Sequence, residues 1–387
     1  MGCAAGSVQA AAAPCDSLDR FEMGFEMGEL LGRGSDREVR SAWECATGTE
    51  IAVKIIRFDS PSAPRRLSTS SSDRRRKDLE HAQAQRRKRA WTEVETLRTV
   101  GDHPNIARLL GSFTTDDAAY VLLERCECSV LAKFDSDPRL LQEGLPWVFQ
   151  GMLTGISACH RARVVHRDVK MDNFLIGTDG ATVKLCDFGV SRRLKPSVVG
   201  LRGAAGTVPM MSPEMVLGDL YDFGTDVWSF GAMAYLILFG ELPYVPKEMS
   251  RCAAKEAIRA GQPSPRFLGA PGPAAGFLRP LLEREPLFRC SAEEALAHPS
   301  LGRDQPTVSS VLRGVPNLQR SMELFRSATG GTASLATAET DAFGATDSMT
   351  TRSAHTSRRG SRRSVMIDDH DLGAHEDGTK NDPSTVE

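Results

Sequence analysis

Three short strings of the sequence contain residues whose types and spacing could do chemistry. The first joins Gly32 and Gly34 to Lys54 on a later apolar run, the second spans 165–173 (Val-His-Arg-Asp-Val-Lys-Met-Asp-Asn), and the third spans 185–189 (Leu-Cys-Asp-Phe-Gly). Glycines allow backbone N–H groups to close on phosphates, and a lysine can reach them as a point charge. Glycine pairs more often mark ordinary turns, but three such strings in this order are very improbable by chance. The sequence therefore indicates chemistry on phosphate groups.

The apolar pattern predicts two kinds of elements around these strings. Between 22 and 57, glycine-bounded and β-branched runs such as 50–56 are typical of half-buried strands. From Leu141 onward the apolar spacing becomes helical, first at Trp147, Val148, Met152, Leu153 and Ile156 on one face and later at Val227, Phe230, Ala234 and Leu238. We therefore expect a mainly β front lobe and a mainly α-helical rear lobe.

The composition excludes several functional classes. The 387 residues include 48 basic and 50 acidic side chains, a net charge of -2 that argues against a chain built to coat nucleic acid, so we expect no specific nucleic-acid partner. Nine scattered cysteines without a C-x-x-C pair favour a reducing compartment over a zinc or disulfide framework. The longest strongly apolar stretch, 231–240, is about half of a membrane-spanning helix, and the N-terminus lacks a basic region before an apolar one. Neither export nor a membrane span is expected.

The motif order and spacing resemble the eukaryotic protein kinase family over about Phe25 to Leu301. The resemblance implies an α+β fold of two lobes: a small antiparallel β lobe with an αC helix, ending at about residue 124, and a larger, mainly α-helical lobe from about residue 127. It implies transfer of the ATP γ-phosphate to protein hydroxyls with Mg²⁺ as metal cofactor. The hinge-to-tail arrangement is most similar to the calcium/calmodulin-dependent and calcium-dependent kinase group.

The same resemblance implies a nucleotide site in the front lobe. Lys54 would bind the nucleotide phosphates and pair with a glutamate of the αC helix, which is Glu93, with Glu95 as the less favoured alternative. The strand 120–126 resembles the hinge, so Leu123 is the expected gatekeeper and the backbone of the next residues faces adenine. The implied nucleotide-binding residues are Leu31, Gly32, Gly34, Val39, Ala52, Lys54, Glu93, Leu123, Glu124 and Cys126.

The catalytic roles follow from the second and third strings. By resemblance, Asp168 would accept the proton of the substrate hydroxyl, and Lys170 would neutralise charge on the transferred phosphoryl group. Asn173 and Asp187 would hold Mg²⁺. A lysine two residues after the catalytic aspartate is the serine/threonine pattern, so we expect Ser/Thr specificity.

The implied activation segment contains Asp187, Phe188, Gly189, Ser197, Thr207 and Glu214. Thr207 should lie near Asp168, and Glu214 should pair with Arg289. A second Asp-Phe-Gly string at 222–224 follows no apolar strand and runs into the pattern of the family's αF helix, where Asp226 would be a structural anchor. The metal role is therefore assigned to Asp187.

Several residues depart from the family pattern. Asp36 and Arg37 stand where an aromatic residue and the third glycine are expected, and a Cβ there could hinder close approach of the backbone to phosphates. The alternative function is therefore a pseudokinase scaffold with weakened ATP binding. Val130 replaces the acidic residue that often follows the hinge, although Asp172 keeps an acidic group beside the catalytic loop, which suggests substrates of basic context. Gly203 occupies the usual phosphoacceptor position, leaving Ser197 as the nearest serine.

The regions outside this domain suggest regulation. Residues 1–24 are expected to form a flexible leader whose Gly2 and Cys3 resemble an acylation signal that could bring the protein to a membrane surface. Residues 59–90 are interpreted as a basic, serine-rich solvated insert that is helical toward its end. A nuclear-import signal in this insert is the less favoured alternative. Residues 302–387 are expected to be a mostly disordered tail with a regulatory helix at 308–326 that calmodulin or another regulator could bind. We expect a cytoplasmic monomer acting on protein substrates.

Overall fold

The computed structural model describes residues 24–33, 37–58, 72–137, 139, 144–244, 250–261 and 272–302. The chain divides into two units, Met1–Ala342 and Phe343–Glu387, and all of the described residues belong to the first. The acylation signal, residues 59–71 of the insert and the helix expected at 308–326 lie outside the described residues.

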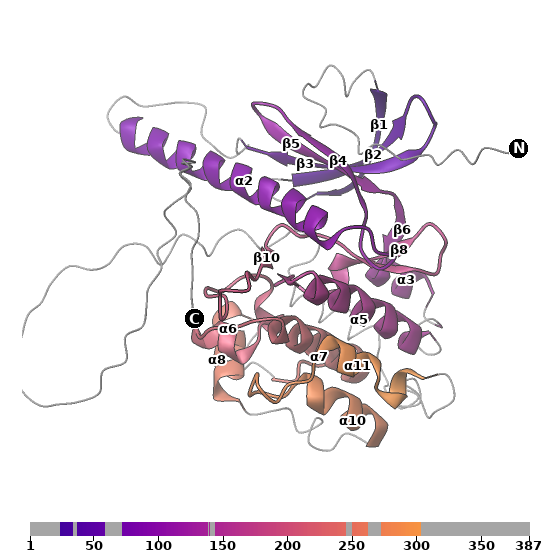
Figure 1. Cartoon of the computed structure of the whole chain (residues 1–387), viewed down its shortest axis with the longest axis vertical. Coiled ribbons are helices and arrows are strands. Elements are labelled where there is room, and N and C mark those ends of the chain that lie inside the picture. The colour runs from indigo at the N-terminus through magenta and orange to yellow at the C-terminus, as the bar shows by residue number, and fades with distance from the viewer. Residues whose placement is uncertain are drawn as a thin grey trace, which may run out of the picture. The chain divides into compact units, whose positions relative to one another are not determined.

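A five-stranded antiparallel sheet in the order β1-β2-β3-β5-β4 forms the front lobe (Figure 1). Its strands are β1 (Phe25–Arg33), β2 (Arg37–Glu44), β3 (Glu50–Arg57), β4 (Leu109–Thr114) and β5 (Ala118–Glu124). Successive side chains of a strand point to opposite faces of its sheet. On β3, Ile51, Val53 and Ile55 pack in a small core on one face, whereas Ile56 packs in the large core on the other. Lys54 therefore points to the face that carries the large core.

One long helix, α2 (Ser72–Val100), packs against that face (Figure 1). Its second half buries Ala90, Val94 and Leu97 in the large core. The first part, residues 72–89, belongs to the segment that we expected to be a solvated insert, helical toward its end. Figure 1 shows the start of the helix extending beyond the edge of the sheet. Arg86 and Arg87 fasten it: Arg86 Nη1 donates to the Phe58 carbonyl at 2.9 Å, and the Arg87 guanidinium lies 4.3 Å from the Phe58 ring centre. This basic cluster is therefore more than solvated charge.

The second lobe is mainly helical. Its helices are α3 (Val130–Ser136), α5 (Leu145–Arg161), α6 (Pro213–Leu217), α7 (Gly224–Phe239), α8 (Arg251–Ala260), α10 (Gly272–Leu281) and α11 (Ala292–Leu296). Short strands and 3₁₀ turns between them are β6 (Cys126–Ser129), β7 (Val164–Val165), η1 (Met171–Asn173), β8 (Phe174–Gly177), β9 (Val183–Leu185), β10 (Arg192–Arg193), η2 (Val208–Met210) and η3 (Pro299–Leu301). Within the described ranges, no helix combines the length and apolar content that a bilayer span needs. The expected α+β class is confirmed.

Two helices form the centre of the second lobe. On α5, the expected apolar face is fully buried at Val148, Met152, Leu153 and Ile156, whereas Trp147 is half-buried. On α7, every residue from 225 to 239 is buried, so this helix is enclosed on all sides rather than on the single face that its spacing suggested. A Cβ at Gly231 would lie 2.8 Å from the Cβ of Leu281, so only glycine allows α10 to approach this closely. The enclosed helix gives the lobe a rigid base for the loops above it.

Candidate active site

A buried ion pair joins the sheet to α2. Lys54 Nζ lies 2.5 Å from Glu93 Oε1, and the two residues are 4% and 2% exposed. Burial by itself would lower the pKa of Lys54, but the carboxylates of Asp187 and Glu93 outweigh it and raise that pKa above its ordinary value. Lys54 is therefore a fixed positive charge. Glu95, the alternative partner, is exposed and pairs with Arg98 at 2.9 Å.

The carboxylate of Asp187 receives two cations. Its Oδ1 lies 2.9 Å from Lys54 Nζ and 2.8 Å from Arg37 Nη1. Burial would raise the pKa of Asp187, yet Lys54 and then Arg37 hold it well below its usual range. The backbone of Asp187 is left-handed, with φ of 63°, a sparsely populated region that non-glycine residues adopt mainly at special positions. This carboxylate is thus ionised and held in a defined orientation.

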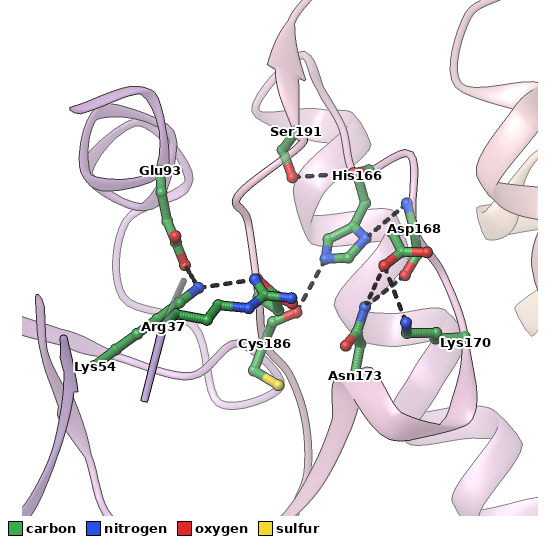
Figure 2. A network of polar contacts seen from close by, with 10 residues as sticks. Arg37, Lys54, Glu93, His166, Asp168, Lys170, Asn173, Cys186 and Ser191 are labelled. Carbon is green, nitrogen blue, oxygen red and sulfur yellow. Dashed lines mark hydrogen bonds and ion pairs between the residues drawn. The ribbon is translucent and has the colours of Figure 1, made fainter. Parts of the chain in front are cut away.

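The catalytic-loop side chains gather around Asp168, which is 4% exposed. Thr207 Oγ1 donates to Asp168 Oδ1 at 2.7 Å, and Lys170 Nζ lies 3.4 Å from its Oδ2. Asn173 Nδ2 donates to the Asp168 carbonyl at 2.7 Å. Figure 2 shows two groups on either side of Cys186, with Arg37, Lys54 and Glu93 in one and His166, Asp168, Lys170 and Asn173 in the other.

The backbone of this loop is fixed from beneath by Asp226, on the enclosed helix α7. Its two carboxylate oxygens accept the backbone N–H groups of His166 and Arg167, each at 2.8 Å. His160 Nε2 lies 3.0 Å from Asp226 Oδ2. Burial would raise the pKa of Asp226, but the contact with His160, the nearby His166 side chain and the backbone N–H of Arg167 lower it. An ionised, fully buried carboxylate therefore holds the loop that carries Asp168.

The His166 ring links the two parts of the site. The ring Nε2 lies 3.0 Å from the backbone carbonyl of Cys186, the residue directly before Asp187. The backbone carbonyl of His166 accepts the Ser191 hydroxyl at 3.1 Å (Figure 2). Phe188, fully buried, packs edge-on against this ring with centroids 5.0 Å apart. The orientations of the 166–168 loop and of the 187–189 string are thus coupled.

The end of the activation segment is packed onto the catalytic loop. Gly206 has φ of 87°, and a Cβ there would lie 2.1 Å from the Arg167 carbonyl, so only glycine fits. Further along, Arg289 forms a buried two-pronged pair with Glu214, at 2.7 and 3.0 Å. Ser197 is exposed, and Gly203 is an exposed left-handed glycine with φ of 86°. The position where a phosphoacceptor was expected, residue 203, therefore carries no hydroxyl.

The nucleotide-binding residues predicted from the sequence lie on adjoining strands. Gly32 pairs with Val39 and Val39 with Lys54, while Ala52 pairs with Leu123 on β5. Leu31, Glu124 and Cys126 lie at the ends of β1 and β5 and the start of β6. Burial and then the Glu124 carboxylate raise the pKa of Cys126 to about 11, so this thiol stays neutral. Gly34 and Asp36 lie outside the described residues.

The second Asp-Phe-Gly string lies elsewhere, at the start of α7. Asp222 is exposed, and its Oδ1 accepts the backbone N–H of Gly224 at 2.9 Å, which is a local turn contact. Among the described contacts, none connects it with Lys54 or Asp168.

Sequence reasoning did not foresee two contacts of the site. Arg37 entered it only as a steric departure, yet it bonds Asp187 from 150 residues away. The contact of His160 with the carboxylate of Asp226 was not predicted either. An arginine in place of a glycine signals altered chemistry, but its bonding partner could be read only from the fold.

Asn173 and Asp187 have oxygens suited to a magnesium ion. Mg²⁺ prefers oxygen ligands and is commonly held by one or two carboxylates together with substrate phosphates. Because the amide nitrogen of Asn173 donates to Asp168, its amide oxygen is the atom available to a cation. Within the described residues, no group of three or more His, Cys, Asp or Glu could hold a metal by itself. The donor set therefore fits Mg²⁺ that arrives with phosphates.

Comparison with known families identifies the architecture. A family model described as "Protein kinase domain" matches residues 25–301. The chain belongs to the protein kinase family. The two-lobed kinase fold expected from the motifs is thereby confirmed.

Three relatives carry kinase names. Serine/threonine-protein kinase KIC1 of Saccharomyces cerevisiae is 27% identical over 290 residues, covering 75% of this chain and 25% of that protein. Sperm motility kinase 3A of Mus musculus is 30% identical over 292 residues, covering 74% and 51%. Serine/threonine-protein kinase PAK 4 of Homo sapiens is 32% identical over 238 residues, covering 61% and 39%. The match thus spans about half of these relatives' length or less, and together with the family it supports a protein serine/threonine kinase.

Proposed function

We propose that this kinase transfers the γ-phosphate of ATP to serine and threonine hydroxyls of proteins. The observation that carries the proposal is the buried carboxylate of Asp168, which accepts a hydroxyl of its own chain, that of Thr207, at 2.7 Å. A carboxylate that binds one hydroxyl at this distance has the geometry needed to accept the proton of a substrate hydroxyl.

In the proposed reaction, the substrate oxygen attacks the γ-phosphorus while its proton passes to Asp168. The bond to the β-γ bridging oxygen breaks, and ADP leaves. Lys170 Nζ, 3.4 Å from Asp168 Oδ2, places a positive charge where negative charge develops on the transferred phosphoryl group. Asp226 acts indirectly, because it fixes the backbone that orients Asp168.

The nucleotide would lie beneath the sheet. Lys54, oriented by Glu93, would bind the phosphates, and the backbone of Glu124 and Cys126 would bind adenine. Asn173 and Asp187 would hold Mg²⁺, which would supply positive charge that neutralises the phosphates. The lysine at position 170 supports Ser/Thr substrates, and Asp172 supports substrates with basic residues near the acceptor.

A pseudokinase scaffold is the second candidate function. The observation that favours it is the Arg37–Asp187 pair, because an arginine already occupies a carboxylate that would bind the metal. A scaffold of this kind would keep the two-lobed fold and bind partners without phosphate transfer.

The finer assignments concern regulation and location. The proposed place in the calcium/calmodulin-dependent group, and a regulator site at 308–326, rest on the order of motifs and on the apolar spacing of that segment. Acylation at Gly2 and Cys3 would add membrane association to an otherwise cytoplasmic, monomeric kinase. Loss of [³H]myristate incorporation in Gly2→Ala would support the acylation, and equal labelling of both chains would contradict it.

Phosphate transfer tests the proposed function directly. The full chain is incubated with [γ-³²P]ATP, Mg²⁺ and a mixture of basic peptides that contain Ser or Thr, beside an Asp187→Ala control. We expect label on Ser and Thr residues with the wild type and its loss with Asp187→Ala. Nucleotide binding without transfer by the wild type would instead favour the scaffold.

A further inference from the structure

Arg37 reaches across the site from the start of β2, just after the segment that contains Gly32 and Gly34. It is the first residue of β2, directly after residues 34–36, and its Nη1 lies 2.8 Å from Oδ1 of Asp187 on the opposite lobe. The two side chains are 21% and 19% exposed, so the contact is largely shielded from solvent. A partly buried hydrogen bond between charged groups is stronger than a neutral one.

The same oxygen of Asp187 also receives Lys54 at 2.9 Å. A Cβ at Gly189 would lie 3.6 Å from Arg37 Nη1, so the guanidinium is packed against the 187–189 string rather than extended into solvent. Two protein cations, Arg37 and Lys54, therefore balance the charge of Asp187. A divalent metal must compete with them for this carboxylate.

The neighbouring arginines behave differently. Arg33, Arg40 and Arg57 all pair with Glu38, at 3.6, 3.5 and 3.2 Å. The carboxylate of Glu38 thus pairs with the other three arginines of these strands. Among the described residues of β1, β2 and β3, Arg37 and Lys54 are the cations that pair with Asp187.

We propose that Arg37 is a tethered cation that occupies the metal-binding carboxylate of Asp187 in the nucleotide-free kinase and moves to the nucleotide phosphates when metal takes its place. This inference rests on the proposed ATP site. Two consequences have the same direction. Metal binding is weakened because Arg37 must leave Asp187, and nucleotide binding without metal is strengthened because Arg37 can neutralise phosphate charge. Both reduce the energetic coupling between Mg²⁺ and nucleotide.

The coupling is measured as a ratio of dissociation constants. Calorimetry gives the Kd of the non-hydrolysable β,γ-imido analogue of ATP for the full chain, first in EDTA and then in excess Mg²⁺. We expect the ratio of the Kd in EDTA to the Kd in Mg²⁺ to be about tenfold larger in Arg37→Gly than in the wild type. Arg37→Gln, which keeps side-chain bulk but no charge, should show the same increase.

Arg40→Gln is the matched control, because it removes a charge from the same strand that pairs with Glu38 instead. Its ratio should equal that of the wild type. Equal ratios in the wild type, Arg37→Gly and Arg37→Gln would overturn the proposed role of Arg37 but not the proposed ATP site. An increase in Arg40→Gln as large as that in Arg37→Gln would have the same meaning. Failure of all four proteins to bind the analogue in either condition would overturn the proposed ATP site as well.

Discussion

The two sides of the candidate site differ in how closely they follow the kinase pattern. On the catalytic-loop side, the buried carboxylate of Asp226 binds the backbone N–H groups of the two residues before Asp168. On the glycine-loop side, Arg37 replaces a glycine and its side chain bonds Asp187. The difference teaches that the departure at Arg37 lies where nucleotide and metal would bind. Compared with a kinase that has glycine at this position, the chain should therefore differ in its affinities for metal and nucleotide more than in the rate of phosphate transfer.

The largest expected effect comes from removing the proposed base. Asp168→Asn keeps the shape of the side chain but cannot accept a proton, so turnover should fall by roughly 10²–10⁴-fold. Steady-state kinetics measures the loss, and a thermal unfolding midpoint close to that of the wild type shows that the fold is retained. Unchanged turnover would mean that the catalytic-loop side does not perform the proposed chemistry.

The anchoring of that side is tested by its buried carboxylate. Asp226→Ala would leave two backbone N–H groups and His160 without their partner, so the free energy of unfolding should fall by about 3 kcal/mol. Chemical denaturation measures the change. Asp222→Ala is the matched control from the other Asp-Phe-Gly string. It removes an exposed turn contact and should cost about 1 kcal/mol or less. Similar losses in the two variants would contradict the anchoring role.

A smaller effect is expected at the ion pair between sheet and helix. Glu93→Gln removes one of the two carboxylates on Lys54 and leaves Asp187 in place, so kcat/KM should fall by about tenfold. Glu95→Gln, which alters an exposed pair with Arg98, should leave kcat/KM within about twofold of the wild type. Equal effects in these two variants would show that the choice of Glu93 is wrong.

The sequence was sufficient to predict the elements that short motifs and apolar periodicity encode. The front sheet and the helix at α5 followed from apolar periodicity, because burial repeats with the period of each element. The family followed from the resemblance of the short motifs. The complete burial of α7 did not follow from spacing, since a helix covered on every side has no polar face to reveal its surroundings. The sequence predicted that the insert is helical toward its end, but not that this helix continues into the αC helix as one element. The first part of α2 is mostly charged, and Arg86 and Arg87 fasten it to the backbone and ring of Phe58, a contact that no local pattern encodes.

Contacts over long sequence separations account for the rest. Arg37 and Asp187 are 150 residues apart, and His160 and Asp226 are 66 apart. No local pattern specifies such pairs, because they depend on how the two lobes and the helices beneath them close together. The departure at Arg37 was visible in the sequence, whereas its partner was not.

The dependence of transfer on Mg²⁺ concentration tests the contrast between the two sides most directly. Initial rates of the wild type and Arg37→Gly are measured at saturating ATP over a range of free Mg²⁺. The account predicts that Arg37→Gly reaches its half-maximal rate at about tenfold lower Mg²⁺ and that the maximal rates agree within about twofold. An unchanged midpoint with a strongly altered maximal rate would contradict it, because Arg37 would then act in the transfer step.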